Sequence, residues 1–203
     1  MNRKDDIISR VGFAMRFAKD EEIYGEGEAA DHVYRMVSGT VRTSRFMADG
    51  RRPIGDFYYQ GDVFGLELGA THAMGAEALS DCVVMAVRRE AIVQAGGESA
   101  LQALILESTS LELTNAREHL SLLVRKSASE RVASFLLGMA RRSGANPIEL
   151  VMGRQDIADY LGLTIETVSR MITQLQGAGV VRFESCRRFR VCDREALLEL
   201  AAA

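Results

Sequence analysis

One stretch, from Arg154 to Met171, constrains the fold more than any other part of the chain. It reads RQDIADYLGLTIETVSRM, with apolar residues at helical spacing on both sides of a central glycine. A helix-turn-helix needs a small residue where its two short helices approach, a glycine in the turn and apolar residues at the inward positions. Ala158 is the small residue, Gly162 lies in the turn, and Thr164 is placed to cap the second helix. The inward positions are all apolar: Ile157, Leu161, Leu163, Val168 and Met171.

The outward face of the second helix carries the side chains that are free to recognise a partner. With Val168 and Met171 turned inward, Glu166, Ser169 and Arg170 face outward near the helix start, where such helices meet base edges. An arginine donates two hydrogen bonds to guanine, and a glutamate accepts one from cytosine N4. The spacing of Glu166 and Arg170 also fits a solvated pair within the helix, worth on the order of a few tenths of a kcal/mol, and this alternative stays open.

A β-hairpin is expected directly after this helix. Gly177 and Gly179 end the helix, and residues 180–184 and 189–192 flank a turn at 185–188 as a wing. Arginines at its tip would touch phosphates, which position a protein on DNA without reading sequence, although a merely soluble turn is the alternative. The predicted contacts with the DNA backbone are Arg154, Thr164, Thr167, Thr173, Arg187 and Arg188.

A long helix is predicted upstream, because the segment from Glu98 to Lys126 contains neither proline nor glycine. Its apolar residues recur in a heptad pattern that is typical of a dimer seam. Packing of the same stripe on the helix's own domain is the alternative. The predicted interface consists of Leu106, Thr109, Leu113, Ala116, Leu120 and Leu123.

The rest of the chain suggests an α+β fold. Short apolar segments at 33–37, 40–46, 52–59 and 82–87, separated by glycine-containing turns, indicate an antiparallel β-roll. A capping box at Ser127–Glu130 begins another helix, which ends near Gly144, and a short strand is expected at Ile148–Met152. The predicted domains are a roll over residues 1–97, a dimerisation helix over 98–126 and a winged helix-turn-helix over 127–203.

Composition narrows the class of protein. With 203 residues, 47% of them hydrophobic, the chain can bury a sizeable core, and no run of apolar residues is long enough for a membrane span. A cytoplasmic location is expected, because no signal peptide is recognisable. Three cysteines without CxxC spacing argue against a disulfide framework or a zinc site. The net charge is -3, but residues 126–203 hold 11 Lys and Arg against 9 Asp and Glu, the sign expected where phosphates are bound.

The order of roll, long helix and winged helix-turn-helix resembles the superfamily of the cyclic-AMP receptor protein and the fumarate and nitrate reduction regulator. Residues 24–27, 38–41 and 61–65 look like its roll signatures, and GLTIETVSR at 162–170 looks like the branch of the fumarate and nitrate regulator. The resemblance implies that Glu166, Ser169 and Arg170 read a TTGAT half-site of an inverted repeat. Ile165 stands where the cyclic-AMP receptor protein has arginine, which favours TTGAT over GTGA.

The same resemblance bears on small ligands. Members that bind cyclic nucleotides place a glutamate directly after Phe-Gly and later an Arg-Ser pair for the phosphate. Here Leu66 follows Phe64-Gly65, Glu67 comes one place late, and the later segment contains Glu77 and no arginine. A cyclic phosphate beside Glu77 would lack a cationic partner, so cyclic-nucleotide binding is not expected.

Neither an iron-sulfur cluster nor haem is expected. The oxygen-sensing members use cysteines near the N-terminus and one more in a later strand, where this chain has Met85. Three histidines leave haem as a thin alternative, but His32, His72 and His119 each fit a surface or helix residue more simply. The expectation is therefore no cofactor, as in the similar FixK-like branch, whose members need no bound effector and control microaerobic, respiratory or nitrogen-fixation genes.

Two functional interpretations remain open at this point. The first is a homodimeric transcription regulator that binds double-stranded DNA, with RNA polymerase as a partner implied by the family. The second is a regulatory module that senses a small ligand or a haem-bound gas and contacts protein. An enzyme is not expected, because the sequence shows no nucleophile and base pairing, metal spacing or phosphate loop, and Gly25-Glu-Gly27 is too short to cradle a phosphate.

Overall fold

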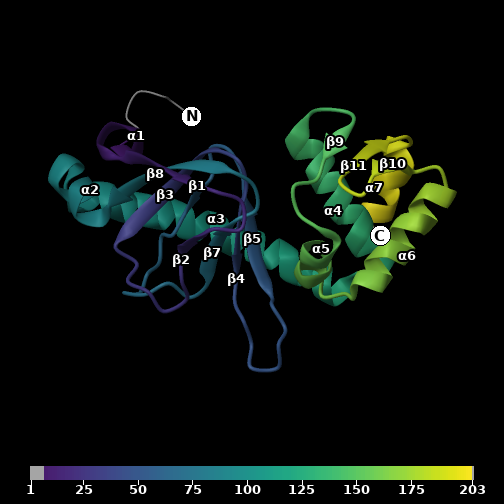
Figure 1. Cartoon of the computed structure of the whole chain (residues 1–203), viewed down its shortest axis with the longest axis horizontal. Coiled ribbons are helices and arrows are strands. Elements are labelled where there is room, and N and C mark those ends of the chain that lie inside the picture. The colour runs from purple at the N-terminus through teal and green to yellow at the C-terminus, as the bar shows by residue number, and fades with distance from the viewer. Residues whose placement is uncertain (1–6, 203) are drawn as a thin grey trace. The chain divides into compact units, whose positions relative to one another are not determined.

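The computed structural model describes residues 7–202, which form two compact units divided after Asn115 (Figure 1). The N-terminal unit is a roll of strands with helices at one end, and the C-terminal unit is a group of helices around a small sheet. This confirms the predicted α+β class.

Two four-stranded antiparallel sheets build the roll. One has the strand order β1-β8-β3-β6 and the other β2-β7-β4-β5. The predicted strands are β3, β4, β5 and β8; the other four are short or flanked by irregular segments, which weakens their sequence pattern. The bounds are β1 Phe13–Phe17, β2 Glu22–Tyr24, β3 His32–Ser38, β4 Val41–Ser44, β5 Ile54–Tyr58, β6 Val63–Phe64, β7 Gly75–Ala78 and β8 Cys82–Arg88.

Gly39 makes the tight connection between β3 and β4. Its φ is +86°, in the region that favours glycine. A Cβ atom there would lie 2.5 Å from the Cβ of Cys82 and 2.6 Å from the carbonyl oxygen of Asp81. Both conditions require glycine, so the two sheets meet at this turn only because the side chain is missing.

His72 belongs to the core of the roll, and its prediction as a surface or helix residue is wrong. Its side chain is 1% exposed, and its ring is stacked on Tyr24 with 3.6 Å between centroids. Burial lowers the pKa of His72, so the ring is neutral near pH 7. The residue follows an isolated bridge between Ala29 and Thr71, a pairing that periodicity in the sequence does not reveal.

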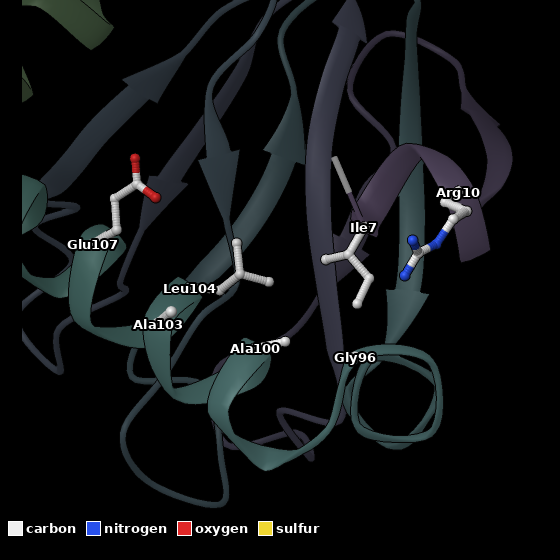
Figure 2. Close-up of a pocket in the computed structure, with 7 residues that line it drawn as sticks. All are labelled: Ile7, Arg10, Gly96, Ala100, Ala103, Leu104 and Glu107. Carbon is white, nitrogen blue, oxygen red and sulfur yellow. The ribbon is translucent and has the colours of Figure 1, made fainter. Parts of the chain in front are cut away.

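Three helices cover one end of the roll. α1 (Ile7–Val11), α2 (Arg89–Gly96) and the start of α3 (Glu98–Arg125) share an apolar cluster that includes Ile8, Val33 and Ile92. An open pocket lies between α1 and α3 (Figure 2). Small side chains, Ala100 and Ala103, line it on α3, with Arg10 and Glu107 at opposite ends of the view.

In the C-terminal unit, the end of α3 is followed by the predicted capping box. Ser127 accepts a hydrogen bond from the amide of Glu130, and the Glu130 carboxylate accepts one from the amide of Ser127. Gly144 ends α4 in a left-handed conformation. The elements of this unit are α4 Ala128–Ser143, β9 Ile148–Glu149, α5 Arg154–Leu161, α6 Ile165–Gly177, β10 Val181–Ser185, β11 Arg188–Val191 and α7 Arg194–Ala202. The sheet order is β10-β11-β9.

Candidate nucleic-acid interface

α5 and α6 form the helix-turn-helix that the sequence predicts. Ile157, Ala158 and Leu161 are at most 1% exposed, so α5 is anchored along its inner side. Gly162 has a φ of +62° and ends α5, and the amide of Leu163 then donates to the carbonyl oxygen of Ala158 at 2.9 Å. Leu163 itself is only partly buried. The turn is therefore set by local backbone geometry as much as by packing.

The first turn of α6 is fixed by its cap. The hydroxyl of Thr164 accepts a hydrogen bond from the amide of Thr167 at 3.2 Å, and the two threonine hydroxyls lie 3.1 Å apart. Val168, Met171, Ile172 and Leu175 are buried and hold the helix against the unit. The opposite side of α6 is thereby presented to solvent in a defined orientation.

The three predicted base-reading residues lie together on that exposed side. Glu166, Ser169 and Arg170 are all exposed, one turn or less apart near the start of α6. Hydrogen bonds from its own backbone amide and from Thr164 lower the pKa of Glu166, so its carboxylate is charged at neutral pH. Across residues 7–202, no ion pair joins Glu166 to Arg170, and the alternative of a solvated pair has no support in this conformation. Both side chains remain available to a base edge.

Two of the predicted backbone contacts are already engaged within α6. Thr167 takes part in the cap, and the hydroxyl of Thr173 donates to the carbonyl oxygen of Ser169 at 3.0 Å. Thr164 is exposed although its hydroxyl accepts from the helix. A hydroxyl has a single O–H donor. Of the Thr164 and Thr167 pair, one hydroxyl keeps its donor for a phosphate, whereas Thr173 must first release the Ser169 carbonyl.

The wing is a twisted hairpin with one apolar and one charged face. Phe183 and Phe189 are cross-strand partners whose rings stack at 5.2 Å, and Phe189 is fully buried. Because side chains alternate along a strand, the neighbouring residues of β10 and β11 point the other way. That opposite face carries Arg182, Glu184, Arg188 and Arg190, all exposed.

Sequence reasoning missed three of these four residues. It identified Arg187 and Arg188 from their place in the turn, and the structure shows both exposed. Arg182 and Arg190 are direct cross-strand partners, and Glu184 lies between them and the tip. The alternation of charged and aromatic residues in RFES and RFR was the available signal, since it places every charge on one face once the hairpin register is known.

Arg154 occupies a different environment from the other backbone candidates. Its guanidinium carbon lies 4.3 Å from the centroid of the Phe183 ring, and one terminal nitrogen, Nη1, is buried without a hydrogen-bond partner. Burial lowers the pKa of Arg154. The side chain therefore packs between α5 and the wing instead of extending into solvent.

The predicted dimer seam is partly exposed. Leu106, Leu113 and Leu120 are 70%, 49% and 61% exposed, and Val124, one turn further on, is 73% exposed. Positions seven apart on a helix differ by only about 20°, so these four residues form one apolar strip, called here the α3 strip. In the second predicted row Ala116 is exposed, whereas Thr109 and Leu123 are half-buried.

A cation lies next to Glu77, contrary to the expectation from its own segment. Arg42 on β4 donates from Nη2 to both carboxylate oxygens of Glu77, at 2.9 and 3.0 Å. The two residues are cross-strand partners, which the sequence does not show because they are far apart in the chain. Since Glu77 itself engages this guanidinium, an anionic ligand would have to compete with it.

Other features of the described residues bear on cofactors and membranes. Within residues 7–202, no group of three or more His, Cys, Asp or Glu side chains is arranged to hold a metal ion. Cys82 is buried, and burial raises the pKa of its thiol, while Cys186 and Cys192 are exposed and all three are free. None of the helices in this part of the chain has the length and apolar character to cross a bilayer.

Comparison with known proteins yields matches to both units. Residues 130–200 match the family model of the Crp-like helix-turn-helix domain, and residues 14–98 match that of the cyclic nucleotide-binding domain. The chain is 44% identical to the nitrogen fixation regulation protein FixK of Azorhizobium caulinodans, over 98% of this chain and 83% of the relative. It is 38% identical to the protein of the same name from Rhizobium meliloti, over 88% and 82%.

A solved structure agrees with these relatives. The structure of FixK2 from Bradyrhizobium japonicum superposes with a TM-score of 0.89 at 46% identity, covering 95% of this chain and 98% of that one. The likeness extends across the roll, α3 and the winged helix-turn-helix, so it concerns the whole architecture and not one module.

Proposed function

The chain belongs to the FixK-like branch of the CRP/FNR family of DNA-binding transcription regulators, and we propose that it binds an inverted repeat of TTGAT-type half-sites as a homodimer. The observation that carries this proposal is the exposed trio Glu166, Ser169 and Arg170 at the start of a capped α6. In each half-site, Arg170 donates two hydrogen bonds to the guanine, and Glu166 accepts one from the amino group of a cytosine. Ser169 contacts an adjacent base or phosphate.

The wing and the ends of the helix-turn-helix supply contacts that do not depend on sequence. Arg187 and Arg188 approach phosphates beside the half-site. Thr164 or Thr167 donates a hydroxyl hydrogen bond to the DNA backbone, and Thr173 does so once its hydroxyl leaves the carbonyl of Ser169. Arg154 holds the wing against α5, so it acts through Phe183 on the placement of these arginines. The contacts of α6 then set the choice of site, and those of the wing set the overall affinity.

A second copy of the chain pairs through the α3 strip. An inverted repeat presents its two half-sites in a two-fold arrangement, and a two-fold dimer places one α6 on each. The exposed leucines of the strip give the dimer an apolar seam that would otherwise face water.

The regulated genes are those of microaerobic respiration or nitrogen fixation, and the regulator acts as an activator through contact with RNA polymerase. The names of two relatives support the first part, since both are nitrogen fixation regulation proteins. A further relative, 37% identical over 83% of this chain, is a transcriptional activatory protein from Rhodopseudomonas palustris.

Selection of bound DNA from a random pool, followed by titration of variants, tests the proposal. Arg170→Ala should lose roughly 1 to 3 kcal/mol on the selected site and lose its preference at one base pair. Glu166→Ala should relax the choice at the paired cytosine. Arg187→Ala is the matched control, because it should weaken all sequences alike and lower the salt dependence by about one counterion. If Arg170→Ala weakens selected and scrambled DNA equally, sequence is read elsewhere.

An effector-dependent regulator is the second candidate, favoured by the match of the roll to the cyclic nucleotide-binding domain. The pairing of Arg42 with Glu77 speaks against a cyclic phosphate, because the guanidinium already has a carboxylate. Purified protein that binds the selected site only after a cyclic nucleotide or a haem ligand is added would establish this alternative. Binding without any addition, by a protein with no visible absorption band, would support the effector-free regulator.

A further inference from the structure

The charged face of the wing has a carboxylate at its centre. Arg182, Arg188 and Arg190 lie on the two strands, and Glu184 lies among them on β10. The α-carbons of Arg182 and Arg190 are opposite each other, an arrangement that is unfavourable for two like charges. Glu184 therefore lies among three positive charges.

Glu184 is held by two arginines at once. Its Oε1 accepts a hydrogen bond from Nε of Arg190, and its Oε2 lies 3.2 Å from Nε of Arg188. The hydrogen bond from Arg190 lowers the pKa of Glu184, and the charges of Arg190, Arg188 and Arg182 lower it further. The carboxylate is thus ionised under the conditions in which DNA is bound.

The donors that hold this carboxylate are the donors that would hold a DNA phosphate. Guanidinium groups bind carboxylates and phosphates with the same planar array of N–H groups. Glu184 occupies the Nε donor of each arginine, so a phosphate that uses this edge must displace Glu184 or share the donor with it. A phosphate that binds the terminal nitrogens instead still meets the nearby negative charge of Glu184. Each exposed ion pair is weak, so the exchange is readily reversible.

We propose that Glu184 is a built-in counter-ion that occupies, in the free protein, the place of a backbone phosphate on the wing. This inference rests on the proposed binding of DNA and adds a residue that limits the affinity of the wing for DNA. Because Glu184 engages Arg188 and Arg190, the wing contributes less to DNA affinity than its arginines would alone. This smaller contribution is the same for every DNA sequence. The regulator is thereby kept from binding random DNA tightly, and more of its affinity comes from α6.

The test compares Glu184→Gln with wild type on the selected site and on a scrambled duplex, at several salt concentrations. Glu184→Gln should tighten binding to both duplexes by roughly three- to tenfold, as expected for release of two exposed pairs. It should also steepen the dependence of log K on log salt by about one to two counterions, because more phosphates are neutralised. The ratio between the two duplexes should stay as in wild type.

Glu149→Gln is the matched control. Glu149 lies on β9, opposite Arg188 in the sheet, and its side chain is exposed. The exchange removes the same charge from the neighbouring strand without breaking an ion pair of Glu184, so it should change affinity by less than twofold, on the order of a single exposed charge. Equal effects of the two variants would mean that only net charge matters and would overturn the proposal.

A double-mutant cycle separates a counter-ion from a residue that orients the arginines. Arg188→Gln should weaken DNA binding more in the Glu184→Gln background than in wild type, because Glu184 no longer competes for that arginine. If Glu184→Gln weakens binding, or leaves affinity and salt dependence unchanged, the proposal fails. Thermal unfolding of each variant shows whether the wing is still folded. If Glu184→Gln is misfolded, Glu184→Asp replaces it, because its shorter side chain cannot span both arginines. Glu184→Asp should then give an intermediate gain in DNA affinity.

The two proposals fail in different ways. A wild-type protein that shows no preference for any selected site contradicts sequence-specific recognition by α6, whereas the effect of Glu184→Gln on scrambled DNA reports on the wing alone.

Discussion

The guanidinium carbon of Arg154, the first residue of α5, lies 4.3 Å from the ring centroid of Phe183 on the first strand of the wing. The amide of Phe183 also donates to the side-chain oxygen of Gln176 on α6, at 2.9 Å. One aromatic residue thus connects the wing to both helices of the helix-turn-helix. The position of the wing arginines relative to α6 depends on this junction.

Substitution of Arg154 should affect stability through its contact with Phe183 and not through the loss of a charge that meets DNA. Arg154→Lys keeps the charge but loses the planar group that stacks on Phe183, and it should lower the stability of the C-terminal unit by about 0.5 to 1 kcal/mol. Phe183→Leu should have a similar effect. Urea unfolding measures the loss, and salt-dependent DNA titration should show an unchanged slope. The opposite result would be an Arg154→Lys protein as stable as wild type, together with an Arg154→Gln protein whose DNA affinity depends on salt by about one counterion less. That result would assign Arg154 to a phosphate contact instead.

The α3 strip should control the oligomeric state. The double exchange of Leu113 and Leu120 to Glu places two charges in the apolar seam and should give monomers in sedimentation equilibrium. Leu111→Glu is the control, because Leu111 is 60% exposed but lies two residues before Leu113, on the other side of the helix. Dimers of the double variant, or monomers of the control, would show that a different surface forms the interface.

Substitution by alanine should be more destabilising at Gly162 than at a glycine inside a helix. Its φ of +62° is unfavourable for a residue with a Cβ, so Gly162→Ala should lose roughly 1 to 2 kcal/mol. Space is not the cause, since the nearest atom to an added Cβ is a Leu123 methyl at 3.5 Å. Gly138 lies inside α4 with nothing within 4 Å, and Gly138→Ala should gain about 0.5 to 1 kcal/mol. Thermal or urea unfolding compares the two, and equal changes would contradict the conformational argument.

Glu112 should make stability depend on pH. Glu112 is an exposed residue, but desolvation of its carboxyl and the charges of Glu67 and Asp56 raise its pKa from 4.5 to about 7. The folded state therefore binds the proton more strongly than the unfolded state, and the stability gained below pH 4.5 is lost as pH rises through 7. Relative to Glu112→Gln, wild type should lose stability across this window and no further above it. Urea midpoints of wild type and Glu112→Gln, measured from pH 4.5 to 8, test this, and parallel curves would contradict it.

The parts of this structure that sequence predicts best are those fixed by neighbours in the chain. The left-handed Gly162, the Thr164 cap and the capping box of Ser127 and Glu130 all follow from contacts within four residues. The burial of Val168 follows from helical periodicity in the same way. Local geometry of this kind places the candidate base-reading residues without knowledge of the rest of the fold.

The contacts that sequence does not predict join distant strands. Arg42 meets Glu77 only because β4 pairs with β7 in one register, and His72 meets Tyr24 through a single isolated bridge. The three arginines around Glu184 likewise depend on the register of β10 and β11 and on a bulge after Phe183. A register shift of one residue would reverse the faces, so composition alone cannot assign these neighbours.

The modest size of the α3 strip makes the proposed activity depend on the concentration of the regulator. Four exposed apolar side chains from each copy form the proposed seam, so the share of dimer depends on the concentration of the chain. While most of the chain is monomeric, the amount of dimer rises with the square of the amount of chain made. Occupancy of an operator then rises more steeply than in proportion to the rate of synthesis of the regulator, so the abundance of the chain acts as a signal in its own right.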